Sequence, residues 1–161
     1  MPFTPLHMGP GLVVKAALQR HFSLMVFGWS QIVIDIQPLV VMLSGNGELH
    51  GFSHTLLGAT LIGAFCGLTG KHPGEFGLRI LRERSHLPIR WPVAFISAFI
   101  GTYSHVLIDS IMHTDVLPLV PYSTHSPLYS IISIDALHMW CLASAAVGGL
   151  AYFALRRRSR L

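Results

Sequence analysis

Long apolar stretches separated by short polar segments dominate the sequence. Residues 55–70, 91–112 and 134–155 contain at most one Asp, Glu, Lys or Arg each. The last two are about as long as the ~20 apolar residues that a helix needs to cross a bilayer. The first is rich in glycine, as helices that pack closely often are. This pattern predicts an all-α protein, an integral membrane bundle of apolar helices.

The first 44 residues allow two readings. Residues 22–43 are long enough for one span, although Asp35 and Pro38 interrupt the apolar run. Alternatively, the Gly-Trp-Ser segment at residues 28–30 breaks the run, so that one helix covers residues 7–27 and a second covers residues 31–43. The residues do not decide between these readings. The expected bundle therefore has about four to five helices.

Composition favours a membrane protein over a soluble enzyme. Hydrophobic residues make up 52% of the chain and charged residues 11%, against about 25% charged residues in soluble domains. Mean hydropathy is +0.56. The net charge is +4, but the basic residues form no groove-reading motif, so nucleic acid is not an expected partner. We expect residues 1–161 to form a single membrane-embedded domain, with no cleaved signal peptide at the start.

The positive charges predict an orientation. Of the eleven Lys and Arg residues, five lie in residues 71–90 and four follow residue 155, whereas residues 44–54 and 113–133 contain none. Two predicted spans separate the two basic segments, so both lie on one side of the membrane. The positive-inside rule assigns that side to the cytoplasm. The C-terminus is therefore expected to be cytoplasmic in a multi-pass protein.

A polar stripe interrupts the apolar run that ends near residue 112. His105, Asp109 and His113 are four residues apart, so a helix places them on one face. An ionisable residue inside an apolar span is costly, which makes it a functional-site hypothesis. Alternatively, these side chains lie in water at a helix end or cap a neighbouring segment. Taken alone, the stripe supports both interpretations equally.

Other segments bring similar residues to the same end. His50 and His54 precede the glycine-rich stretch, and Asp35 lies in an earlier apolar run. No Lys or Arg is expected on that side to neutralise the carboxylates, and a bound cation would do so. His and Asp are usual ligands of zinc and similar divalent ions. Asp135 and His138, in the first turns of the last span, are further candidates near a substrate.

The order of these motifs resembles that of a known family. The chain has Pro-Phe-Thr-x-x-His at residues 2–7, then Asp35, then His-Gly-Phe-Ser-His-Thr-Leu-Leu at residues 50–57. His-Val-Leu-Ile-Asp-Ser follows at residues 105–110, before a proline-rich loop. This order is similar to that of bacterial inner-membrane proteins classed as metal-dependent hydrolases, which are distantly similar to zinc-dependent phospholipase C and to single-strand-specific zinc nucleases. The resemblance covers roughly residues 1–125.

The resemblance implies an all-helical, inner (plasma) membrane protein with one or two divalent metal ions, in the first place Zn²⁺. In the soluble relatives, the aspartate that matches Asp109 can bridge two metals. The chain departs from the family because Ile-Gln-Pro follows Asp35 and no His-x-x-x-Glu pair occurs, so three metals are not expected. The ligands that the resemblance implies are His7, Asp35, His50, His54, His105 and Asp109.

We therefore expect a membrane-embedded metal-dependent hydrolase that acts on phosphoesters, including lipid-like ones, with membrane lipids as its surroundings. Asp35 and Asp109 are the expected catalytic carboxylates. The alternative is a non-catalytic membrane protein or a divalent-metal carrier, but a carrier needs ligands reachable from both sides, whereas these candidates gather at one end. His7 can join them only if its helix begins near that end, which favours the reading with a break near Gly28.

Overall fold

The structure, a computed structural model, describes residues 5–158, which form helices and no strand. The all-α prediction is confirmed. Residues 2–4 of the N-terminal motif lie outside the described part. With α2 and α3 taken as one bent helix, there are six helices, more than expected, because α1 and α5 are short additions. The helices are α1 (Met8–Leu18), α2 (Leu24–Ile34), α3 (Ile36–Ser44), α4 (Leu56–Thr69), α5 (Lys71–Ile80), α6 (Trp91–Met112) and α7 (Ile134–Arg158).

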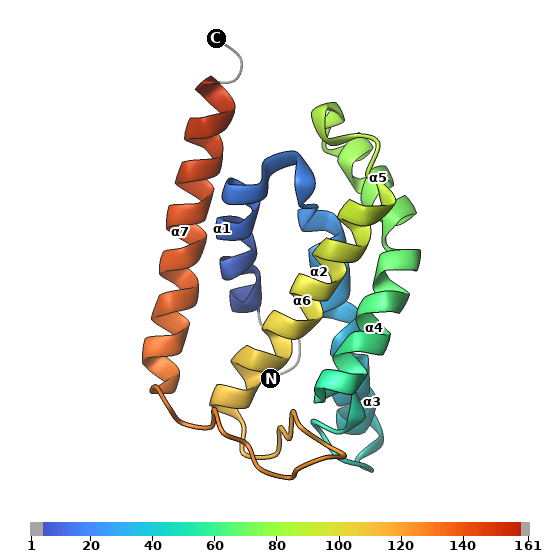
Figure 1. The fold of residues 1–161 in the computed structure, drawn as a ribbon, viewed down its shortest axis with the longest axis vertical. Coiled ribbons are helices and arrows are strands. Elements are labelled where there is room, and N and C mark those ends of the chain that lie inside the picture. Colours follow the sequence, from blue (N-terminus) through green and yellow to red (C-terminus); the bar gives the residue numbers. More distant parts are fainter. Residues whose placement is uncertain (1–4, 159–161) are drawn as a thin grey trace.

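Helix α6 lies at the centre of the bundle (Figure 1). It packs most extensively against α4 and next against α2. A Cβ atom added to Gly101 would overlap the hydroxyl of Ser30 on α2. Only glycine at position 101 therefore lets α6 approach α2 this closely. Close approach of this kind is typical of helices in membrane proteins. It holds the inner face of α6 directly against α2.

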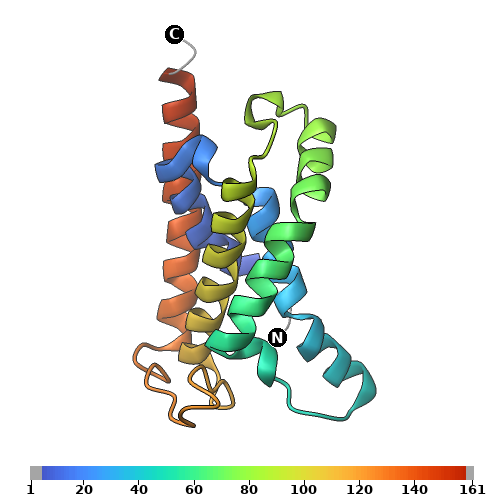
Figure 2. The ribbon, with the colours of Figure 1, turned by 45° about the vertical axis from the view of Figure 1, so that its right-hand side comes forward.

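Helix α1 runs parallel to α7 and packs along it (Figures 1 and 2). A Cβ atom on Gly9 would overlap the backbone of Cys141, and one on Gly148 would overlap the backbone of Leu12 and Val13. From the first contact to the second, the residue numbers rise along both helices, so α1 and α7 run in the same direction. Helix α1 therefore begins within the bundle and rises to the end where α7 finishes.

The break predicted near Gly28 is wrong, because Gly28 lies inside α2 and the chain turns at residues 19–23 instead. The ammonium of Lys15 stabilises this turn by donating hydrogen bonds of 2.8 Å to the carbonyls of Gln19 and Phe22. Ser23 then caps α2 by accepting a hydrogen bond from the amide of Val26. A short α1 thus replaces the long first helix of that reading.

Three segments are long and apolar enough to cross a membrane: Leu24–Ser44, Trp91–Met112 and Ile134–Arg157. The first joins α2 to α3, so the structure follows the reading with a single bent span. Pro38 has no amide hydrogen to donate to the carbonyl of Ile34, which explains why the helix is interrupted at Asp35. Helix α4 is apolar but has only 14 residues.

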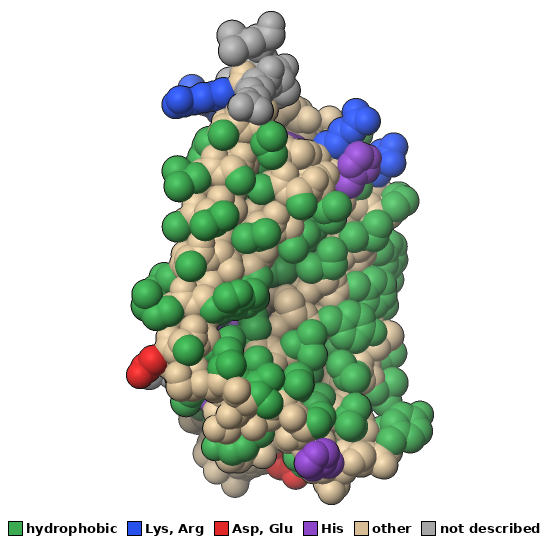
Figure 3. Space-filling model, turned by 60° about the vertical axis from the view of Figure 1, so that its left-hand side comes forward, with side chains coloured by type: hydrophobic (Ala, Val, Ile, Leu, Met, Phe, Trp, Pro, Cys, Tyr) green, Lys and Arg blue, Asp and Glu red, His purple; other side chains and the backbone are tan. Residues whose placement is uncertain are grey.

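The described Lys and Arg side chains lie at one end of the bundle. On the face shown in Figure 3 they lie toward the end where α7 finishes, acidic side chains lie toward the other end, and a broad apolar surface separates them. Glu75 and Glu83 pair with Lys71 and Arg156 at the basic end. Lys15 and Arg20, which the orientation argument did not use, also lie at the basic end, where they border one cavity with Arg90 and Arg156. The opposite end is formed by α3 and the connection 113–133 (Figure 2).

The charged segment 71–90, expected as a loop, contains α5 and a short 3₁₀ turn, Arg84–His86. Glu75 organises it from a buried position. Its carboxylate accepts hydrogen bonds from Lys71 (2.7 Å) and from the amide of Ile89 (3.1 Å). The hydrogen bond from Lys71 lowers the pKa of Glu75, although burial acts in the opposite direction. Glu75 is therefore ionised at neutral pH and joins α5 to the start of α6.

Candidate metal site

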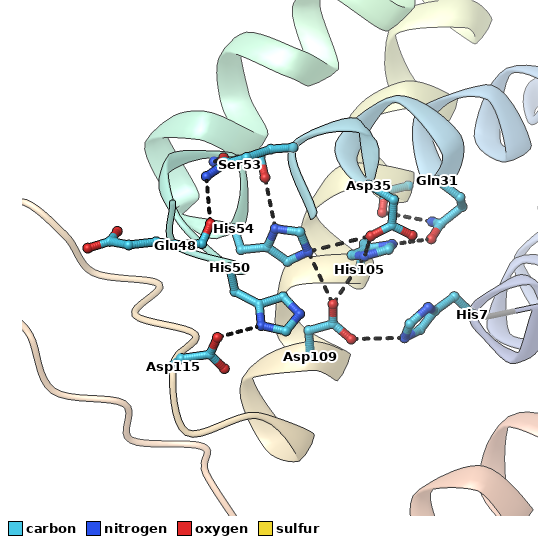
Figure 4. Close-up of polar contacts among 12 residues, drawn as sticks. His7, Gln31, Asp35, Glu48, His50, Ser53, His54, His105, Asp109 and Asp115 are labelled. Atoms are coloured by element: carbon cyan, nitrogen blue, oxygen red, sulfur yellow. Dashed lines mark hydrogen bonds and ion pairs between the residues drawn. The ribbon is translucent and has the colours of Figure 1, made fainter. Parts of the chain in front are cut away.

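Five buried side chains from four segments meet near the end of the bundle opposite the basic residues (Figure 4). The four-residue spacing on α6 places two of them on one face, as predicted. A third lies at the bend between α2 and α3, and two end the 3₁₀ turns Pro5–His7 and Phe52–His54. Each is at most 4% exposed. The five are His7, Asp35, His54, His105 and Asp109.

Two imidazoles and two carboxylates form the centre of this cluster. The Nε2 atom of His105 lies 3.2 Å from Asp35 Oδ1 and 3.2 Å from Asp109 Oδ2. The Nε2 atom of His54 lies 3.2 Å from the same oxygen of Asp109 and 3.7 Å from Asp35 Oδ1. One potential ligand atom from each of the four residues lies within 4.8 Å of every other.

These distances fit a metal site better than a hydrogen-bonded network. Among the described residues, the Nε2 atoms of His7, His54 and His105 are buried and have no hydrogen-bond partner, despite the nearby carboxylates. Buried polar atoms without a partner are rare and costly. Ligands 2.0–2.1 Å from a tetrahedral zinc ion are about 3.3–3.4 Å apart, close to the nitrogen–oxygen distances here. The residues therefore fit a divalent cation.

Charge balance supports the same conclusion. If the imidazoles are neutral, Asp35 and Asp109 give the group a charge of −2, buried at the end of the bundle where the described chain has no Lys or Arg side chain. Two carboxylates buried in one group repel each other and are costly to remove from water. One divalent cation would balance this charge. His and Asp donors suit zinc and similar ions, but they do not identify the metal.

His7 meets the other oxygen of Asp109. Its Nε2 atom lies 3.2 Å from Asp109 Oδ1, and its ring centroid lies 4.5 Å from that of His105. The structure therefore places His7 beside Asp109, and its role as a ligand stays a prediction. His7 reaches this position without a break at Gly28, because the short α1 begins next to the cluster.

Gln31 orients His105 from the neighbouring helix. The amide nitrogen of Gln31 donates a hydrogen bond to the carbonyl of Gly101 (2.9 Å), which turns its oxygen toward His105 Nδ1 at 2.7 Å. Because that oxygen can only accept, Nδ1 of His105 carries a proton, and in the neutral imidazole the lone pair on Nε2 is then available to a metal ion. Outer contacts of this kind fix the tautomer of metal-binding histidines.

We expect Gln31→Leu to weaken divalent metal binding by about 10–100-fold, the usual effect of removing an outer partner of a ligand. Gln31→Glu keeps an acceptor for Nδ1 and should retain binding. Titration of the purified, metal-free variants with Zn²⁺ would measure both. Equal affinity of Gln31→Leu and wild type would show that Gln31 does not position His105.

His54 is held by the start of α4 and by α3. Its Nδ1 atom lies 2.9 Å from the hydroxyl of Ser53, and the amide of Ser53 donates a 2.8 Å hydrogen bond to the side-chain oxygen of Gln37. The side chain of Thr55 caps α4 by accepting from the amide of Gly58 at 2.9 Å. These bonds leave Nε2 of His54 facing the carboxylates.

A second group of possible ligands shares Asp109. His50, Asp109 and His113 each offer an atom within 4.8 Å of the others. The rings of His50 and His113 stack with centroids 4.4 Å apart. His50 Nδ1 also lies 2.9 Å from Asp115. Partial burial acts to raise the pKa of Asp115, but the hydrogen bond with His50 outweighs it and the pKa is lowered.

The sequence predicted the residues at the centre of the cluster, but it did not predict correctly which residues surround them. His50 lies in the second group rather than beside Asp35, and no ion pair or hydrogen bond within the described residues links Asp135 or His138 to the cluster. The sequence reasoning missed Gln31, which lies one helical turn before Asp35. Asp115 had no local signal, because it reaches His50 from a distant loop.

No protein-family model, curated protein or solved structure matches this chain. The family resemblance noted from the motifs is therefore an expectation that these comparisons do not test.

Proposed function

We propose that this protein is a membrane-embedded, metal-dependent hydrolase of phosphoesters. The observation that carries the proposal is the convergence of three buried imidazole nitrogens, all without hydrogen-bond partners, on two carboxylates. The order of the His and Asp motifs, which is similar to that of the inner-membrane metal-dependent hydrolases, supports the choice of reaction. Zn²⁺ is the proposed metal because the donors are imidazole and carboxylate.

In this proposal, Asp35, His54, His105 and Asp109 hold one ion. When bound, such an ion supplies Lewis acidity toward a phosphoryl oxygen and lowers the pKa of water at the site to about 7. Asp35 or Asp109 would orient the attacking water by accepting its hydrogen bond, which requires that one of the four residues leave a position on the ion open to water. Gln31 keeps the imidazole of His105 in the tautomer that faces the ion. His50, Asp109 and His113 are the candidates for a second ion.

We further propose that the three long apolar segments cross the bacterial inner membrane with the basic end in the cytoplasm. The concentration of the described Lys and Arg side chains at one end supports this orientation. Asp109 lies three residues before the last residue of α6, or about 5 Å along the helix axis. The site would therefore lie within the outer part of the bilayer, close to the periplasmic surface.

Cysteine labelling tests this orientation. Thr124 lies in the connection 113–133 and Ser85 at the basic end, and both are exposed, whereas the native thiols Cys66 and Cys141 are buried. We expect a membrane-impermeant maleimide to label Thr124→Cys in intact spheroplasts, and Ser85→Cys only after lysis. The reverse result would place the site on the cytoplasmic side.

Metal analysis of the purified protein tests the function. We expect one or two equivalents of Zn²⁺ or a similar ion, together with hydrolysis of 4-nitrophenyl phosphoesters that a chelator abolishes and added metal restores. Bound metal without hydrolysis of any ester tried would favour the non-catalytic or carrier alternative. Protein that binds no metal under any loading condition would remove the hydrolase proposal.

A further inference from the structure

A cavity of about 460 Å³ opens beside the cluster, between α1, α2 and the start of α5. His7, Asp35 and His105 border one end of it, so it is continuous with the proposed metal site. Its other end reaches Gly74 on α5. This volume lies within the range of about 300–1,000 Å³ that is typical of small-molecule sites.

The two ends of this cavity differ in polarity. All the titratable side chains among its described lining residues lie at the cluster end, and none is Lys or Arg. The wall along α2 is apolar and includes Met25, Gly28, Trp29 and Ile32. From Asp35 back to Leu24 this wall is about 16 Å long, at 1.5 Å per helical residue. A charged group is therefore accommodated at one end only.

The cavity opens on the side of the bundle. Ile32 on its wall is 49% exposed, and it lies in the middle of the apolar segment Leu24–Ser44. In a membrane, this mouth would face hydrocarbon and not water. A ligand with an apolar chain could enter sideways, without the chain ever leaving the bilayer.

We infer that the substrate is an amphiphile, a phosphoester whose single hydrocarbon chain lies in this groove along α2. This inference rests on the proposed function, because the phosphoester group is placed by the metal site at the polar end. The hydrocarbon chain would contact Met25, Gly28 and Trp29, where burial of apolar surface stabilises the complex. The groove thus selects long-chain esters over short, water-soluble ones.

Gly28 allows the groove to be filled without disturbing the helix. A Cβ atom added there would lie 3.5 Å from Met8 Cε, an ordinary contact, so Gly28→Leu places its additional atoms in the cavity. Gly149 on α7 provides the matched control, because a Cβ atom there would meet nothing within 4 Å. Both positions are helical glycines in apolar segments. Ile32→Phe, which narrows the mouth, is a second variant in case Gly28→Leu does not fold.

The activity test compares dodecyl and methyl 4-nitrophenyl phosphate with the metal-loaded protein in lipid nanodiscs. We expect Gly28→Leu to lower kcat/KM for the dodecyl ester by at least about tenfold, as changes in an apolar pocket do, and to change the methyl ester by less than about twofold. Gly149→Leu should leave both esters unchanged. An equal loss on both esters would overturn the inference, since the damage would then lie in the metal site.

A binding test works even if no hydrolysis is found. Trp29 borders the groove. In a protein that also carries Trp91→Phe and Trp140→Phe, Trp29 is the remaining tryptophan, and quenching of its fluorescence reports binding of a brominated dodecyl phosphate in nanodiscs. We expect saturable quenching that Gly28→Leu removes and Gly149→Leu retains. If this quenching pattern is found but no ester is hydrolysed, the proposed function is rejected and the inference that the groove binds a hydrocarbon chain stands. Non-saturable quenching that is equal in all three proteins would reject the groove itself.

Discussion

Asp109→Asn should remove the bound cation, with a loss of metal affinity of more than the ~10–100-fold seen when an outer partner is removed, and should abolish any hydrolysis. Asp109 is the residue on which the cluster depends, because its two oxygens lie 3.2 Å from Nε2 atoms of three histidines. The substitution keeps the size of the side chain and removes its charge. Metal content of the purified variant and hydrolysis of a 4-nitrophenyl ester measure the result.

The variant should still fold in the membrane. The new amide group can donate hydrogen bonds to the nearby imidazole nitrogens, which otherwise have no partner among the described residues. Thermal unfolding of the metal-free proteins should therefore show Asp109→Asn to be at least as stable as wild type. This outcome separates a loss of ligand from a loss of fold.

Asp115→Asn is the matched control for charge. Asp115 is also an aspartate near the cluster, but its side chain is half exposed and contacts His50 instead of the central group. We expect this variant to retain the ion held by Asp35, His54 and His105. Full metal occupancy in Asp109→Asn, or equal loss in both variants, would contradict the proposed ligand set.

His113 lies next to the cluster, although the family motifs do not include it. Its place one turn after Asp109 puts it on the same face of the chain, beside His50. The four-residue spacing therefore predicts the position of His113, which the ligands implied by the family resemblance leave out. His113→Ala should lower the metal content only if a second ion is bound.

The apolar spans, and the placement of His105 and Asp109 on one face of α6, could be predicted because both depend on local periodicity. Helices α4, α6 and α7 begin and end within a few residues of the expected positions, since a run of apolar residues between polar segments is a strong signal. His105 and Asp109 share a face simply because they lie one turn apart. These features need no knowledge of how the helices pack.

The start of the chain could not be predicted in the same way. The turn at residues 19–23 depends on the contacts of Lys15 with two backbone carbonyls, and the bend at Asp35 on a missing amide at Pro38. A hydrogen bond from a side chain to nearby backbone carbonyls can thus end a helix where the apolar pattern continues. The resulting short α1 is what brings His7 to the cluster.

Gly58→Ala should lower stability and metal binding together, although Gly58 touches no metal-binding atom. A Cβ atom at this position would overlap the carbonyl of Phe52 and come within 3.2 Å of Ser53 Cα. Both belong to the backbone of the 3₁₀ turn that carries His54, so a flexible side chain cannot relieve the overlap. The turn itself is fixed, because the carbonyl of Phe52 accepts hydrogen bonds from the amide and the hydroxyl of Thr55.

Either the turn or the first residues of α4 must move to accept the methyl group, and both movements shift the imidazole of His54 away from Asp109. We expect a cost of about 1–3 kcal/mol in the free energy of unfolding, the usual range for overpacking, and weaker Zn²⁺ binding. Gly149→Ala is the matched control: no atom lies within 4 Å of its Cβ position, so it should be neutral or slightly stabilising through helix propensity. Thermal unfolding and metal titration in the same detergent measure both effects. If Gly58→Ala unfolds at a lower temperature but binds Zn²⁺ as tightly as wild type, His54 is not a ligand, because the displaced turn would then carry nothing that the ion requires.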